Sequence, residues 1–150
     1  MKPITNKISH LYQNIFYILL AACWVTGVGF FILDTWLIVE GEFGPEKHFL
    51  QLPGLQVHAA TAFFIMVFFG GFFFGHMPRA RKVPHSQTSG WLLLSALGYL
   101  IFSAYLLYYI GNENIRFYIM YSHLIIGVLL PIMLVCHLRS HKQHKRKLKR

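Results

Sequence analysis

Four histidines inside two long apolar stretches are the side chains of this sequence best placed to do chemistry. His58 and His76 are 18 residues apart in one stretch, and His123 and His137 are 14 apart in another. On a regular α-helix, His58 and His76 share a face about 27 Å apart. The second pair lies about 21 Å apart and within roughly 40° of one face. The spacing predicts two stacked sites, each taking one imidazole from each helix.

Two facing imidazoles can fill both axial positions of a haem iron. Zinc prefers four ligands, and no carboxylates or thiolates cluster near either pair. We therefore expect two haem b groups, an outer one between His58 and His123 and an inner one between His76 and His137. Bis-histidine ligation leaves no iron position for oxygen, so this arrangement suits electron transfer between the two irons.

The inner site has more than one possible ligand pair, because the spacings of 18 and 14 residues do not match. Helix tilt or unwinding near residues 70–71 would bring the inner histidines to one level. Alternatively, His10, just before the first apolar stretch, pairs with His137. A third arrangement pairs His141, further along the last stretch, with His76.

Four apolar stretches are long enough to cross a membrane, since about 20 apolar residues span the hydrocarbon. The stretches and the basic tail that follows them are residues 15–39, 55–76, 90–110, 116–138 and 139–150. Apolar residues make up 55% of the chain and charged residues 13%, which excludes an ordinary soluble domain. We predict one all-α membrane domain over residues 1–150, a four-transmembrane-helix up-down bundle.

Local signals add detail to these spans. The first is too long for a signal peptide and lacks its cleavage site, so we expect it to remain as a span. Residues 111–115 form a short turn, which makes the last two spans antiparallel neighbours. Thr88 or Ser89 can cap the third span, and Pro131 should kink the fourth.

The net charge of +9 is distributed as in a multi-pass membrane protein. Basic residues precede the first span, separate the second and third, and follow the fourth, whereas the acidic residues lie in or beside the other two loops. This positive-inside pattern predicts that both termini are cytoplasmic. The basic tail is expected to contact anionic membrane lipid and no nucleic acid. Cys23 and Cys136 lie inside spans without a C-x-x-C-H motif and are expected to be packing residues.

Residues near the span ends could complete the sites. Haem propionates need cationic partners, and Arg116 at the outer end and Arg79 or Arg81 at the inner end are suitably placed, although Arg116 could serve only as an interface anchor. His48 lies in the acidic outer loop, residues 40–54, either as an ordinary interfacial histidine or beside a quinone. The acidic loop could also dock a basic redox partner protein.

Several short segments carry a family resemblance. They are VEGEFGPEKH (39–48), LQVHAATAF (55–63), HMPRAR (76–81), TSG (88–90), YLLYY (105–109), ENIRF (113–117), SHLIIG (122–127) and HLRSH (137–141). Over most of its length the chain resembles a family of small bacterial four-span membrane proteins, which implies a multi-pass protein of the bacterial cytoplasmic (inner) membrane. Its histidine spacing in the fourth span is also similar to that of the di-haem cytochrome b subunits of formate dehydrogenases and nickel–iron hydrogenases.

The resemblance to the cytochromes implies ligands for each haem. It implies His58 with His123 at the outer haem and His137 at the inner one. The remaining inner ligand of those cytochromes comes from the first span, which favours His10 here. His76 is a departure from that pattern.

We therefore expect a b-type di-haem membrane cytochrome that transfers electrons across or within the membrane. It would act as a subunit or partner of a redox system, because the chain has no flavin or nucleotide motif of its own. One alternative is a haem-free anchor subunit of a larger complex. Another is a histidine-lined ion or proton transporter, for which Asp34 at a span edge is the nearest carboxylate.

Overall fold

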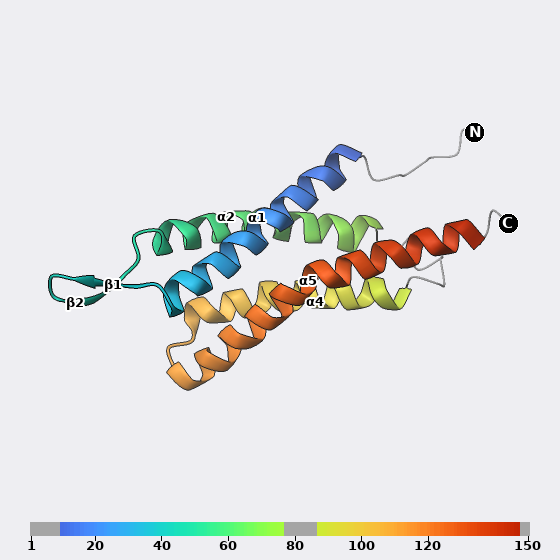
Figure 1. The fold of residues 1–150 in the computed structure, drawn as a ribbon. Helices are drawn as coiled ribbons and strands as arrows, with labels where there is room; N and C mark the ends of the chain where they lie inside the picture. Colours follow the sequence, from blue (N-terminus) through green and yellow to red (C-terminus); the bar gives the residue numbers. More distant parts are fainter. Residues whose placement is uncertain (1–9, 77–86, 148–150) are drawn as a thin grey trace. The chain divides into compact units, whose positions relative to one another are not determined.

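The computed structural model describes residues 10–76 and 87–147, with side chains except at residues 76 and 141–147. It contains four long helices, α1 (His10–Thr35), α2 (Gln51–Gly71), α4 (Gln87–Tyr109) and α5 (Glu113–Lys147). Strands β1 (Ile38–Gly41) and β2 (Gly44–Lys47) separate α1 from α2, and a π-helical turn, η1 (Phe72–His76), follows α2 (Figure 1). The chain divides into two units, Met1–Ile65 and Met66–Arg150.

Four helices within the described residues are long and apolar enough to cross a membrane, as the sequence predicted. They are His10–Thr35, Gln51–Gly75, Gln87–Tyr109 and Glu113–Ser140. Only 6% to 22% of the most apolar window of each helix is buried inside the protein. Apolar side chains left exposed on this scale favour an apolar surrounding over water, which is compatible with a multi-pass membrane protein.

The first predicted span is too long, because its last residues belong to a β-hairpin. Helix α1 ends at Thr35, and Ile38 and Val39 pair with Lys47 and Glu46 in the antiparallel hairpin. A two-residue turn joins the strands, and Gly44 has φ +121°, a conformation that L side chains rarely adopt. The all-α prediction therefore describes the four helices but misses this hairpin.

The hairpin is fastened to the end of α1 through Asp34. Lys47 Nζ lies 2.7 Å from Asp34 Oδ1 and 3.2 Å from the Asp34 carbonyl oxygen, and Gln51 donates to the same carboxylate oxygen. Figure 1 shows the hairpin projecting beyond the adjoining ends of α1 and α2. Asp34, the carboxylate considered for a transporter, thus takes part in a structural contact.

Helix α2 begins with contacts made by His48. The backbone N–H of Gln51 donates to the His48 carbonyl oxygen (2.9 Å), and His48 Nδ1 accepts from the backbone N–H of Leu50 (3.2 Å). The imidazole also stacks on Phe49, with ring centroids 4.7 Å apart. Pro53 falls in the first turn of the helix, where its missing N–H costs no hydrogen bond. His48 therefore has a structural role at the start of α2.

The regular winding of α2 ends at Gly71. In the π-helical turn Phe72–His76, hydrogen bonds span five residues, so each turn holds more residues than in an α-helix. The prediction that His58 and His76 share a face assumed uniform α-helix, and η1 changes that phase. The helix therefore departs from α-helical winding directly after residues 70–71.

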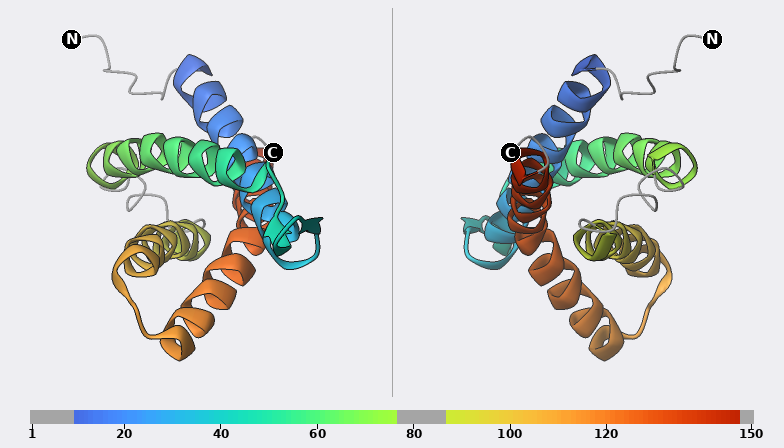
Figure 2. Two further views of the ribbon diagram at one scale, coloured as in Figure 1. Left: turned by 90° about the vertical axis from the view of Figure 1, so that its left-hand side faces the viewer. Right: turned by 90° about the vertical axis from the view of Figure 1, so that its right-hand side faces the viewer.

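Helices α4 and α5 form a helical hairpin, as the short turn predicted (Figure 2). The Asn112 side chain caps α5 by accepting from the backbone N–H of Ile115 (3.1 Å). Helix α5 contains Pro131 and continues through Leu138 to Lys147, so the predicted basic tail is largely helical. The side chains buried along this pair include Ala96, Leu97 and Ser103 of α4 and Leu130 of α5.

The contacts of Asp34 predict how the outer hairpin responds to trypsin. Replacing Asp34→Asn removes the charge partner of Lys47, so trypsin should cleave after Lys47 faster, by up to about fivefold, the factor that corresponds to ~1 kcal/mol for an exposed ion pair. Gel electrophoresis of the detergent-solubilised protein measures the rate. Glu42→Gln, in the hairpin turn, is the control and should cleave like the unsubstituted chain. Equal rates for all three proteins would contradict the anchoring role.

Candidate functional site

His58 of α2 is held by the backbone of α1. Its Nδ1 lies 2.8 Å from the carbonyl oxygen of Cys23 and 3.5 Å from the Cys23 sulfur, and the thiol lies 3.9 Å from the His58 carbonyl oxygen. A carbonyl oxygen can only accept, so Nδ1 carries the proton of the neutral ring. The lone pair of the imidazole is therefore on Nε2, the nitrogen farther from the backbone.

Gly27 makes room for the same imidazole. A Cβ atom at Gly27 would lie 2.7 Å from His58 Cε1 and 2.9 Å from Nδ1, closer than real contacts allow. Two residues further along α1, a Cβ at Gly29 would meet nothing within 4 Å. Glycine at position 27 thus lets the ring of His58 lie against the backbone of α1.

His123 of α5 is held by a serine of α4. Its Nδ1 lies 2.7 Å from Ser103 Oγ, and the Ser103 hydroxyl also donates to the Leu100 carbonyl oxygen at 3.2 Å. Ser103 is 1% exposed, the lowest value among the buried residues of the described chain. A buried hydroxyl in an apolar helix pair is costly unless it is hydrogen-bonded, and the imidazole supplies that bond.

His137 repeats this contact near the other end of α4. Its Nδ1 lies 2.9 Å from Ser89 Oγ, and a Cβ at Gly90 would lie 3.4 Å from its Cε1. Because α4 begins at Gln87, Ser89 is inside the first turn and its hydroxyl contacts His137. The predicted capping role for Ser89 is therefore replaced by a contact between helices.

The other predicted residues are placed less fully. His10 is exposed at the first position of α1. Arg116 is exposed in the first turn of α5, where its backbone N–H donates to Asn112. His76 and His141 lie on described backbone, but their side chains are outside the description. Arg79, like Arg81, lies outside the described residues altogether.

The pairing of imidazoles stays a prediction. His58 belongs to the unit Met1–Ile65, whereas His123 and His137 belong to Met66–Arg150. Within the described ranges, no three His, Cys, Asp or Glu side chains gather as a group that could hold a metal ion. A bis-histidine centre needs only two side chains, so the relevant features are the state and surroundings of each imidazole.

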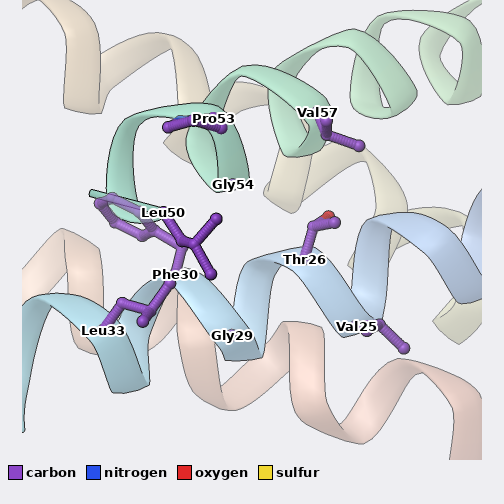
Figure 3. A pocket seen from close by; sticks show the side chains of 9 residues that line it. All are labelled: Val25, Thr26, Gly29, Phe30, Leu33, Leu50, Pro53, Gly54 and Val57. Carbon is purple, nitrogen blue, oxygen red and sulfur yellow. The ribbon is translucent and has the colours of Figure 1, made fainter. Parts of the chain in front are cut away.

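An apolar groove of about 300 Å³ lies between α1 and the start of α2 (Figure 3). Its lining consists of Val25, Thr26, Gly29, Phe30, Leu33, Leu50, Pro53, Gly54 and Val57. The Thr26 hydroxyl donates to backbone carbonyls of its own helix, at 2.7 Å from Ala22 and 3.2 Å from Cys23. The groove therefore offers a ligand an apolar surface with few polar groups to hydrogen-bond to it.

The groups that hold the histidines were not predicted from the sequence. They are the Cys23 carbonyl, Ser89 and Ser103, none of which belongs to a recognised motif. One signal was available, because Ser89 and Ser103 are separated by 14 residues, as are His123 and His137. A carbonyl of the backbone leaves no such signal.

Comparison with known proteins found no family model, no curated protein and no solved structure that matches this chain. The resemblance to di-haem cytochrome subunits therefore remains a prediction. Any conclusion about function must come from the histidine geometry itself.

The two glycines of α1 predict a matched pair of effects on stability. Gly27→Ala should place a methyl group against His58 and lower the melting temperature, with an overpacking cost of roughly 1–3 kcal/mol. Gly29→Ala adds the same methyl group in open space and should leave the melting temperature unchanged or raise it. Thermal unfolding of the detergent-solubilised variants measures both. Similar melting temperatures for the two variants would mean that His58 does not pack on Gly27.

Proposed function

We propose that this chain is a four-span b-type cytochrome that binds two haem b groups and transfers electrons across the bacterial cytoplasmic membrane. The observation that carries the proposal is the engagement of Nδ1 in His58, His123 and His137. Each of these nitrogens lies within 2.9 Å of a polar atom from another helix. Histidines that ligate metals usually have the same hydrogen bond at the nitrogen remote from the metal.

The donor set fits a haem iron. The His58 Nδ1–H···O=C bond leaves the lone pair on Nε2, the state that an axial ligand requires. Within the described residues, no three His, Cys, Asp or Glu side chains gather into a group of the kind that a four-ligand zinc site requires. Gly27 and Gly90, beside two of the three rings, keep bulky side chains away from the imidazoles.

Each residue then has a role in holding the cofactor. His58 and His123 are the proposed axial ligands of the outer haem, and His137 pairs with His76, or with His10 or His141 in the alternative arrangements, at the inner one. Arg116 and Arg79 are the proposed partners of the propionates. When bound, haem supplies reversible one-electron transfer at its iron. The protein fixes the ring nitrogens, excludes water and tunes the potential through hydrogen bonds and burial.

The proposed topology places both termini in the cytoplasm and the hairpin outside. The distribution of Lys and Arg supports this orientation. A green fluorescent protein fused after residue 150 should fluoresce, because it folds in the cytoplasm. Alkaline phosphatase inserted after Phe43 should be active, because it needs the outer compartment. The opposite pair of results would reverse the topology and exchange the outer and inner sites.

The hairpin supports the proposal of a redox partner protein. Glu40, Glu42 and Glu46 are exposed on it, and Phe43 in its turn is 93% exposed. A basic partner surface would complement these carboxylates. A quinone is the proposed small-molecule partner near His48, since the apolar groove includes Leu50, two residues further along.

Haem content tests the proposal directly. Purified, detergent-solubilised chain from haem-supplied cells should contain two b haems by pyridine haemochrome assay. His58→Ala and His123→Ala should each lose one haem, and the double variant should lose the same single haem, because both residues hold one group. His48→Ala is the matched control and should retain both haems.

Other outcomes decide against parts of the proposal. Loss of two haems in the double variant would assign His58 and His123 to different sites. One haem in the unsubstituted chain would remove the inner site. No haem in any preparation would overturn the cytochrome proposal and favour the anchor subunit or the transporter, which a transport assay in vesicles separates.

A further inference from the structure

Helix α4 presents hydroxyl groups to α5 in the same register as the histidines of α5. Ser103 contacts His123 and Ser89 contacts His137, at 2.7 and 2.9 Å. The two serines are 14 residues apart, and so are the two histidines. Because α4 and α5 are antiparallel, equal spacings on both helices bring the two serine–histidine couples into contact together. The α4–α5 hairpin therefore contains two serine–histidine contacts of the same kind, about 21 Å apart along the helices.

Ser103 makes two hydrogen bonds that bear on where the proton of His123 lies. A serine hydroxyl has one proton to donate and lone pairs to accept. Ser103 donates its proton to the Leu100 carbonyl oxygen, which can only accept. The Ser103–His123 contact fits either donor direction by distance alone, but an oxygen whose proton is donated to Leu100 accepts from His123, which would place the ring proton on Nδ1 and the lone pair on Nε2.

We infer that Ser103 is a positioning residue that holds His123 in its Nδ1–H tautomer. Fixing the tautomer keeps Nε2 ready to ligate and fixes the rotation of the ring. The role in tuning haem rests on the proposed function, whereas the tautomer belongs to the protein alone. Loss of the hydroxyl acceptor would make the ligand less electron-rich and raise the reduction potential of the iron that it holds.

A third contact between the same helices provides the control. Tyr99 Oη lies 2.6 Å from Ser122 Oγ, so it also links α4 to α5, but it touches no histidine by that bond. Tyr99→Phe therefore removes a hydrogen bond between the helices without removing an acceptor of an imidazole. An effect specific to Ser103 separates control of the tautomer from general loosening of the hairpin.

Nitrogen-15 NMR of histidine-labelled, haem-free chain in detergent tests the tautomer, with the imidazoles neutral. His123 is assigned by the resonances lost in His123→Ala. The unsubstituted chain should show His123 with its proton on Nδ1. Ser103→Ala should move the proton toward Nε2, Ser103→Thr should restore the original pattern, and Tyr99→Phe should preserve it. In haem-loaded protein, Ser103→Ala should also weaken haem binding at that site by roughly 10- to 100-fold and raise its potential.

The outcomes separate this inference from the proposed function. A proton on Nε2 in the unsubstituted chain, or an unchanged tautomer in Ser103→Ala, would overturn the role of Ser103. The predicted tautomers in a chain that never binds haem would sustain the inference and overturn the cytochrome proposal. If Ser103→Ala does not fold, the unsubstituted and Ser103→Thr spectra still decide where the proton lies.

Discussion

The arrangement of the candidate sites depends on one constraint, the need of a polar ring among apolar helices for a hydrogen-bond partner. A polar group removed from water without a partner costs several kcal/mol, roughly 2–7 by transfer measurements. Three histidines inside the apolar helices, His58, His123 and His137, meet this requirement through Nδ1. The partners are the Cys23 carbonyl for His58, Ser103 for His123 and Ser89 for His137. These hydrogen bonds fix the orientation of each imidazole, and they also link each histidine's helix to the neighbouring helix.

The two units satisfy this constraint in different ways. In the first, His58 takes a backbone acceptor and lies against Gly27, which requires the ring to approach the backbone of α1 closely. In the second, side-chain hydroxyls reach across from α4, and close approach of backbones is not needed. The cytochrome proposal uses both types of contact, since each engages Nδ1 and the proposal assigns coordination to Nε2.

The sequence predicted the features that depend on long patterns. Four apolar stretches identified four helices, and the short turn before Glu113 identified α4 and α5 as antiparallel neighbours. The hairpin was missed because Ile38 and Val39 extend the apolar run of α1, so composition could not separate strand from helix. The basic tail was read as separate from the last span, although α5 is continuous to Lys147. In both cases hydropathy located the end of the apolar stretch, and the helix ends at a different residue.

Candidate ligands were predictable, but their supporting contacts were not. A histidine in an apolar stretch is conspicuous, whereas Ser103 is an ordinary residue whose role depends on the rotation of α4 about its axis. The sequence raised unwinding near residues 70–71 only as one way to align the inner histidines, and it did not indicate that the turn after Gly71 would be π-helical. For this reason the spacing of His58 and His76 was treated as if the helix were uniform.

The backbone acceptor of His58 has a consequence for how such a site can change over evolution. The oxygen that holds His58 belongs to the peptide unit of Cys23, and every residue at that position would provide the same oxygen. Point mutation at position 23 can therefore alter the sulfur contact while the hydrogen bond to the ring is inherited unchanged. The hydroxyls at positions 89 and 103, by contrast, belong to side chains, so a single substitution at either position can remove or replace the one it carries. Point mutation can therefore change the hydrogen-bond partners of the α5 histidines, whereas it cannot remove the carbonyl partner of His58, which every residue at position 23 retains.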